Sequence, residues 1–217
     1  TVSMPSLDDL QVAGHVVIVR VDFNVPLAND GAGGRVITDT GRIHAALPTI
    51  DYLREHRARI LLLAHLGRPK GVVTPEASLE PVAQELSRVL SIDVPLAADL
   101  AQARDELNRA SDGGVVVLEN IRFDARETSK DPAERAALAR ELADLGDFFV
   151  SDGFGVVHRE QASVTELAAF LPHAAGRLVE RESAVFSQLL AQPHRPYVVI
   201  LGGSKVSDKL GVIGNLI

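Results

Sequence analysis

The sequence of 217 residues contains no cysteine and no tryptophan, and only 4% of its residues are aromatic. The lack of cysteine excludes disulfides, thiolate zinc sites and cysteine nucleophiles, while seven histidines keep imidazole chemistry open. The core must be built mainly from Val, Leu, Ile and Ala. That composition suits helices packed on a parallel sheet better than a sandwich with an aromatic core.

Positive charge is also in deficit, since 22 Lys and Arg face 29 Asp and Glu, for a net charge of −7. Broad binding of nucleic acid relies on a surplus of cations, so we expect no nucleic-acid partner. A small anionic ligand is still allowed, because a local cluster of cations can oppose the overall charge. The longest apolar runs are well below the ~18 residues of a membrane span, and no signal peptide is recognisable. We expect a cytoplasmic protein with no membrane partner.

Short apolar runs recur along the chain, and none of them alternates cleanly with polar residues. The runs are 15–21, 59–64, 114–118, 147–150 and 197–201. Patterns typical of helices lie between them, at 39–56, 78–90, 131–146 and 176–193. Strands buried on both faces that alternate with helices predict an α/β fold. We expect a Rossmann-like parallel β-sheet with helices on both faces, in three α/β/α layers.

Two of the predicted helices carry signals at their start. Ser78 is a candidate cap and Pro81 lies in the first turn that follows it. Asp131 is a candidate N-cap, with Pro132 as the first helical residue. The connections at 22–39 and 151–164 are predicted to be long loops, which are usually functional in compact domains.

Polar residues follow the predicted strands, where open α/β sheets bind their ligands. They are Arg20, Asp22 and Asn24 after the first strand, His65 and Arg68 after the second, Arg122 after the third, and Asp152, His158 and Arg159 after the fourth. Arg42 lies near the start of the first helix. Guanidiniums bind phosphate and carboxylate with two hydrogen bonds. The set therefore predicts a site for a small di- or trianion with at least one hydroxyl.

Structural roles compete with this interpretation for each residue alone. A single loop arginine is more often a solvated charge, and His65 is as easily a structural histidine. Arg20 lies inside a strand pattern and is expected to pair with a carboxylate, and Asp152 to order its glycine turn. Asp22 and Asn24 either bond a ligand hydroxyl or hold an arginine. The recurrence of cations at one topological position favours a binding site.

Two glycine-rich segments resemble known motifs only in part. "GFGVVH" (153–158) lacks the third glycine of the dinucleotide-binding fingerprint, and "LGGSKVSDK" (201–209) does not satisfy the P-loop pattern. Lys205 and Lys209 are nevertheless four residues apart, on one face of a helix that follows two glycines. They either meet a phosphate or are solvated lysines beside an ordinary turn. No compact ligand spacing predicts a metal held by the protein.

Six blocks, "RVDFNVP", "RIHAALPTI", "AHLGRPKG", "LENIRF", "SDGFGVVHR" and "LGGSKVSDK", resemble the phosphoglycerate kinase family in order and spacing. The resemblance covers essentially the whole chain. It implies a phosphoglycerate-binding domain at 1–175, an interdomain helix and hinge at 176–196, and the truncated start of a nucleotide-binding domain at 197–217. About half of a family member is then absent, so we expect the chain to be inactive by itself.

The resemblance also implies a role for each matched residue. Catalysis is expected from Arg42 and Lys205, and a contact with the nucleotide phosphates from Lys209. The residues expected to bind the substrate are Asp22, Asn24, Arg42, His65, Arg68, Arg122 and Arg159. Three positions depart from the usual family residues, namely Gly153, Gln161 and Ser204.

The implied reaction is reversible phosphoryl transfer between 1,3-bisphosphoglycerate and ADP, which gives 3-phosphoglycerate and ATP in glycolysis and gluconeogenesis. Mg-ATP and Mg-ADP enter as substrates that are bound mainly by the absent half, and we expect a monomer. One alternative is a non-catalytic phosphosugar-binding module that uses the same basic rim. Another is a dinucleotide-binding oxidoreductase domain, which the incomplete glycine fingerprint disfavours.

Overall fold

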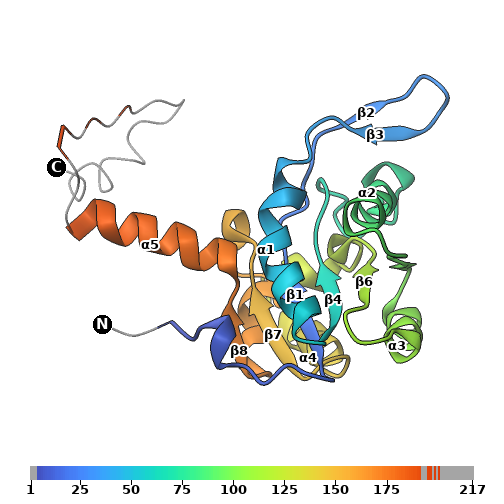
Figure 1. The fold of residues 1–217 in the computed structure, drawn as a ribbon. Coiled ribbons are helices and arrows are strands. Elements are labelled where there is room, and N and C mark those ends of the chain that lie inside the picture. Colours follow the sequence, from blue (N-terminus) through green and yellow to red (C-terminus); the bar gives the residue numbers. More distant parts are fainter. Residues whose placement is uncertain (1–3, 192–194, 197, 199, 201–217) are drawn as a thin grey trace. The chain divides into compact units, whose positions relative to one another are not determined.

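Six parallel strands form the central sheet of the protein (Figure 1). The computed structural model describes residues 4–191 together with residues 195, 196, 198 and 200. The strands are β1 (Val16–Arg20), β4 (Arg59–Leu63), β5 (Leu96–Ala97), β6 (Val115–Leu118), β7 (Phe148–Ser151) and β8 (His173–Ala175). Their order across the sheet is β5-β6-β4-β1-β7-β8, and every neighbouring pair is parallel.

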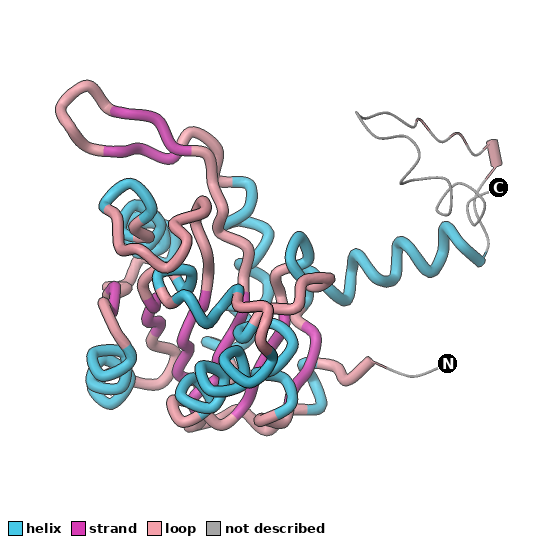
Figure 2. The backbone as a smooth tube through the Cα atoms, turned by 180° about the vertical axis from the view of Figure 1, so that it is seen from behind, coloured by secondary structure: helices cyan, strands magenta, loops and turns pink. Residues whose placement is uncertain are grey.

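Helices cover both faces of this sheet, as the alternation of magenta strands and cyan helices in Figure 2 shows. They are α1 (Gly41–Glu55), α2 (Glu80–Leu90), α3 (Leu100–Arg109) and α4 (Pro132–Ala143), and a fifth helix, α5 (Arg177–Ala191), follows β8 in the chain. Successive residues of a strand point to opposite faces. Val17 and Val19 therefore share one core with α1 and α2, whereas Ile18 shares the other core with α3 and α4. The predicted three-layer α/β/α fold is confirmed.

Strands that read as uniformly apolar are buried on both sides, as expected for a parallel sheet. All five residues of β1 and all four of β6 are buried. Arg20 is the only charged residue within them, and it is 1% exposed. The chain divides into two compact units, Thr1–Val179 and Glu180–Ile217, and the sheet belongs to the first. The domain boundaries expected from the sequence stay predictions.

Of the two predicted helix starts, the structure confirms the one at Asp131 and corrects the one at Ser78. Asp131 caps α4, because its carboxylate accepts a hydrogen bond from the Ala133 N–H at 2.8 Å, and Pro132 opens the helix. α2 begins at Glu80 after the 3₁₀ turn η2 (Pro75–Ala77), and its N-cap is Leu79 rather than Ser78, although the Glu80 N–H donates to the Ser78 hydroxyl at 3.2 Å. These capping interactions satisfy donors that a helix cannot pair internally.

The connection at 22–39 is a β-hairpin and not only a long loop. It contains β2 (Leu27–Asn29) and β3 (Arg35–Ile37), which pair antiparallel. Asp30 Oδ1 closes the hairpin by accepting hydrogen bonds from two backbone N–H groups of its turn, at 2.8 Å each. Strands of three residues are too short to produce a recognisable period in the sequence.

Other elements also escape sequence analysis. β5 and β8 have two and three residues, and α3 is ten residues long with an Asp99 cap that the sequence analysis did not use. The connection at 151–164 leads into a π-helical turn, η6 (Ala162–Glu166), and η4 (Ala125–Thr128) is a 3₁₀ turn after β6. The strand predicted at 197–201 lies almost wholly outside the described residues. None of the helices in the described part of the chain is long and apolar enough to cross a membrane.

Candidate functional site

β1 is the switch point of the strand order, because it pairs with β4 on one side and with β7 on the other. The strands β4, β5 and β6 lie on one side of β1, and β7 and β8 lie on the other. The crevice beyond the carboxyl ends of such strands is where open α/β sheets bind ligands. The segments that follow β1, β4, β6 and β7 carry the residues singled out from the sequence. The topology therefore delivers these segments to one edge of the sheet.

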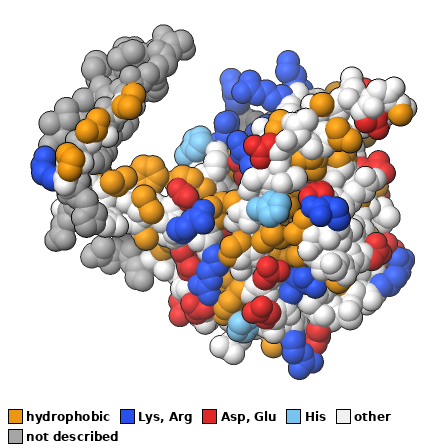
Figure 3. All heavy atoms as spheres, turned by 45° about the horizontal axis from the view of Figure 1, so that its top comes forward, with side chains coloured by type: hydrophobic (Ala, Val, Ile, Leu, Met, Phe, Trp, Pro, Cys, Tyr) orange, Lys and Arg blue, Asp and Glu red, His pale blue; other side chains and the backbone are white. Residues whose placement is uncertain are grey.

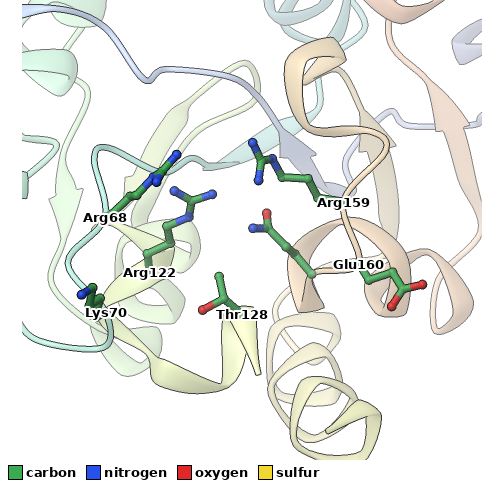
Figure 4. A pocket seen from close by; sticks show the side chains of 7 residues that line it. Arg68, Lys70, Arg122, Thr128, Arg159 and Glu160 are labelled. Atoms are coloured by element: carbon green, nitrogen blue, oxygen red, sulfur yellow. The ribbon is translucent and has the colours of Figure 1, made fainter. Parts of the chain in front are cut away.

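A pocket of about 490 Å³ opens among these segments. It is lined by Arg68, Lys70, Arg122, Thr128, Arg159, Glu160 and Gln161. The guanidiniums of Arg68, Arg122 and Arg159 point toward one another, while the carboxylate of Glu160 points away from them (Figure 4). The structure thus brings together three arginines that follow three different strands.

These three arginines form no ion pair with any carboxylate in the part of the chain that the structure describes. Arg122 donates from Nη1 to the Gly67 carbonyl oxygen at 2.8 Å, and its Nε is buried without a hydrogen-bond partner among the described atoms. Burial, together with the charges of Arg159 and Arg68, lowers the pKa of the Arg122 guanidinium. An anion in the pocket would relieve this repulsion.

Basic side chains also gather on the molecular surface. In Figure 3, Lys and Arg side chains form one group near the upper edge of the view, whereas elsewhere on the visible face basic and acidic side chains are interspersed. A local excess of cations of this kind attracts anions even when the whole chain is negative.

His65 follows β4 and is only 5% exposed. Burial and the charges of Arg20, Arg122, Arg159 and Arg42 lower its pKa to about 3. The four guanidiniums come from different segments, and all act on the same imidazole. His65 is therefore neutral at pH 7, close to the cations but not one of them.

Asn24 has a structural partner in the turn after β4. Its Oδ1 accepts a hydrogen bond from the Gly67 N–H at 2.9 Å, while the Gly67 carbonyl accepts from Arg122. Gly67 has a positive φ of 64°, a conformation that glycine adopts without strain. The turn that presents Arg68 is thereby held from both sides. Asn24 thus holds the backbone of this turn, which is neither of the two roles that the sequence left open for it.

Asp22 forms an ion pair with Arg42, and the Asp22 side chain is 11% exposed against 50% for Arg42. Gly155 packs against this pair. A Cβ on Gly155 would lie 2.5 Å from Asp22 Oδ2 and 3.7 Å from Arg42 Nη1. Asp22 therefore holds an arginine, as one of the two sequence interpretations expected, and a side chain at position 155 would displace the Asp22 carboxylate.

The residues given structural alternatives also have defined partners. Arg20 is buried and reaches a carboxylate only through Ser163, with which its Nε bonds at 2.8 Å. Asp152 is buried and accepts a hydrogen bond from the Leu178 N–H at 3.0 Å, at the start of α5. It thus anchors a helix start, whereas the sequence suggested a role in its own glycine turn.

Sequence analysis missed Lys70, Thr128 and Glu160 as lining residues, and it noted Gln161 only as a departure from the family. Proximity in the chain to Arg68 or Arg159 is the one signal that points to three of them. Lys205 and Lys209 lie outside the described residues. Within residues 4–191, no three histidine, aspartate or glutamate side chains gather closely enough to hold a metal ion.

The parallel three-layer fold, with guanidiniums converging beyond its switch-point strands, defines an open α/β protein whose candidate ligand site lies at the carboxyl ends of its strands. The sequence model of the family described as phosphoglycerate kinase matches residues 7–217. The chain therefore belongs to the phosphoglycerate kinase family.

Individual relatives agree with this assignment. A phosphoglycerate kinase of Bifidobacterium adolescentis is 58% identical over 217 residues, which cover 99% of this chain and 53% of the relative. One of Mycobacterium avium is 58% identical over 211 residues, covering 94% of the chain and 50% of the relative. The solved structure of phosphoglycerate kinase from Coxiella burnetii matches with a TM-score of 0.83 at 37% identity, covering 99% of this chain and 52% of that one. The chain spans about half the length of these relatives.

Proposed function

We propose that this chain is the substrate-binding half of a phosphoglycerate kinase, which transfers a phosphoryl group reversibly between 1,3-bisphosphoglycerate and ADP. The observation that carries the proposal is the convergence of Arg68, Arg122 and Arg159 on one pocket in a member of this family. Three guanidiniums with free donors suit the dianionic phosphate of 3-phosphoglycerate. A cytoplasmic monomer is part of the same proposal and rests on the family resemblance.

The non-reacting phosphate would lie among the three arginines, with His65 beside it. The carboxylate end would extend toward Arg42, which acts on the same imidazole and pairs with Asp22. Asn24 would fix the turn that carries Arg68. This division places the reacting end of the substrate away from the phosphate that serves only for binding.

In the forward direction the bond between phosphorus and the carboxyl oxygen breaks, and a bond from phosphorus to a terminal oxygen of ADP forms. The leaving group is a carboxylate, which needs little help from an acid, so no general base or acid is assigned. Catalysis then consists of positioning and of charge stabilisation on the equatorial oxygens. Arg42 and Lys205 would supply that charge, Lys209 would contact the nucleotide, and magnesium would arrive with the nucleotide as part of the substrate.

Two substrates held by different domains require closure of a hinge that excludes water. We place that hinge at 170–196 and expect the chain to turn over poorly or not at all without the nucleotide-binding half.

The experiment that tests the proposal is a calorimetric titration of 3-phosphoglycerate into the 217-residue chain, followed by addition of the nucleotide-binding half of a relative. We expect binding by the chain alone and ATP-dependent turnover only after the second half is added. Binding without any turnover in the mixture would instead indicate a phosphosugar-binding module, and no binding at all would contradict the proposal.

A further inference from the structure

Arg20 ends β1, and its guanidinium is buried although it does not line the pocket. Its Nε donates to the Ser163 hydroxyl at 2.8 Å, and its Nη1 donates to the Val21 carbonyl oxygen. Its Nη2 lies 3.3 Å from Nδ1 of His65. Because a guanidinium is always protonated and has only donors, Nδ1 must accept this hydrogen bond.

This contact determines where the imidazole carries its proton. A neutral ring whose Nδ1 accepts holds its hydrogen on Nε2. The charged groups that act on His65 from the surrounding segments are all guanidiniums, those of Arg20, Arg122, Arg159 and Arg42. Burial and these cations together keep the pKa of His65 at about 3, so the ring stays neutral at pH 7.

Ser163 connects Arg20 to a carboxylate with no exposed surface, that of Glu127. The Ser163 hydroxyl donates to Glu127 Oε1 at 2.6 Å, and the Ser163 N–H donates to Oε2 at 2.9 Å. Burial raises the pKa of Glu127 and the charge of Arg20 opposes that rise. Burying a network of polar side chains destabilises the fold unless the side chains hydrogen-bond to one another. Here each of these side chains has a hydrogen-bond partner. This series of hydrogen bonds links Glu127 on η4 to Ser163 on η6, then to Arg20 on β1, and ends at His65 after β4.

We propose that Glu127, Ser163 and Arg20 are positioning residues that hold His65 in its Nε2–H tautomer, so that His65 serves the anion site as a neutral hydrogen-bond donor. This inference rests on the proposed function only in taking the natural ligand to be a phosphate ester. A neutral donor adds a directed hydrogen bond but no charge. Affinity for a fully ionised anion should therefore not change over the pH range where an ordinary histidine titrates.

The first test is an NMR measurement of the imidazole nitrogens in the chain without ligand, between about pH 5.5 and pH 8, which spans the ordinary titration of histidine. We expect His65 as the Nε2–H tautomer throughout. In Ser163→Ala and Glu127→Gln the ring should become a mixture of tautomers, because Arg20 Nη2 is no longer held against Nδ1. The matched control is Ser87→Ala, which removes a half-buried hydroxyl on α2 and should leave the His65 signals unchanged. A parent spectrum with His65 protonated on Nδ1 overturns the proposal.

The second test uses sulfate, which stays doubly charged over this pH range, titrated into a His158→Gln background to remove the exposed imidazole beside Arg159. Affinity should be constant with pH, and Ser163→Ala should weaken it about fivefold, the equivalent of one net hydrogen bond. A glutamine amide can occupy the place of Nε2, whereas an asparagine amide cannot. His65→Gln should therefore bind sulfate about tenfold more tightly than His65→Asn. Affinity that rises as the pH falls through 6.5 would show a cationic histidine and overturn the proposal.

The two tests separate this inference from the proposed function. Sulfate binding with the expected tautomer, but no competition by 3-phosphoglycerate, would leave the positioning role intact and reject the substrate. If Ser163→Ala or Glu127→Gln does not fold, the parent spectrum and the His65→Gln and His65→Asn pair still decide, because neither depends on those variants.

Discussion

Two pockets of nearly equal size, at opposite ends of the same strands, use arginine in opposite ways. The pocket at the amino end of β6 has a volume of about 520 Å³, against about 490 Å³ for the one among Arg68, Arg122 and Arg159. At the amino end, Arg109 pairs with Glu106 at 2.9 Å, and Arg54 lies 3.9 Å from Asp51.

The difference shows that neither volume nor the number of arginines identifies an anion site. A guanidinium that already holds a carboxylate has used its donors and its charge locally. At the carboxyl end, no carboxylate in the described ranges forms such a pair with the three pocket arginines, so their charge remains available to a ligand although Arg122 Nη1 already donates to the Gly67 carbonyl. Whether an arginine is paired depends on the folded chain. The following five predictions test whether this difference between the two pockets holds.

Arg42 combines features of the two kinds of arginine. It is paired with Asp22, and its charge also helps to lower the pKa of His65, together with those of Arg122 and Arg159. Under the proposed function, in the chain combined with a nucleotide-binding half, Arg42→Ala should lower kcat by about 10²–10³-fold, because the charge that Arg42 would supply matters most in the transition state. The KM for 3-phosphoglycerate should change far less. Steady-state kinetics measure both constants, and an unchanged kcat would contradict the role.

Arg122→Ala should produce the largest loss of binding in the chain itself. It removes a cation, and it releases the Gly67 carbonyl that orders the turn. We expect sulfate and 3-phosphoglycerate to bind about 100-fold more weakly, as for a charge-assisted hydrogen bond plus its supporting contact. Calorimetry measures the affinity. Arg109→Ala, in the paired pocket, is the matched control and should change it by less than about twofold.

Burial of His65 and the cations around it also make stability depend on pH. In the unfolded chain this histidine takes up a proton below about pH 6.5, whereas in the folded chain its pKa is about 3. Stability therefore falls as the pH drops through this window, and the loss at pH 5 should be about 2 kcal/mol relative to pH 7.5.

Urea unfolding at the two pH values measures this loss. The variant His65→Gln should lack this share of the pH dependence, and His44→Gln, which removes an exposed imidazole on α1, should retain it. Equal pH dependence in the parent chain and His65→Gln would show that His65 is not the group responsible.

Gln161→Glu would add a carboxylate to the pocket of Arg68, Arg122 and Arg159 and make it resemble the pocket at the amino end of β6. Gln161 lines the pocket and is 5% exposed, and its Oε1 is buried without a hydrogen-bond partner among the described atoms. A carboxylate there should pair with the arginines and weaken sulfate binding about tenfold. Gln161→Met, which has a similar length and no charge, is the control for shape. Similar affinities for the two variants would argue against pairing as the deciding factor.

The smallest effect on stability and affinity is expected from the Arg57–Asp112 ion pair near the amino end of β6. Arg57 and Asp112 lie 2.7 Å apart, with 75% and 41% of their side chains exposed. Arg57→Ala should cost less than about 1 kcal/mol of stability, as is usual for exposed ion pairs, and should not alter sulfate affinity. Thermal unfolding and calorimetry test the two halves of this statement. A marked loss of affinity would mean that the ends of the sheet are coupled.

Much of the fold is predictable because it depends on patterns that one segment carries alone. The uniformly apolar run that became β1 and the Asp131-Pro132 start of α4 both correspond to the observed elements. The hairpin of β2 and β3 was not predictable, since its strands of three residues form through pairing with each other.

The sequence by itself determined the kinds of element, the parallel sheet and the identity of the cations at the strand ends, because periodicity, capping and motif order are local properties. Only the tertiary structure decided which cations are neutralised. Asp22 pairs with Arg42, Ser163 joins Arg20 to a buried carboxylate, and Arg122 forms no ion pair with any carboxylate in the described ranges. Charge pairing acts over a few ångströms between residues that are distant in the chain, so it exists only once the strands have been brought together.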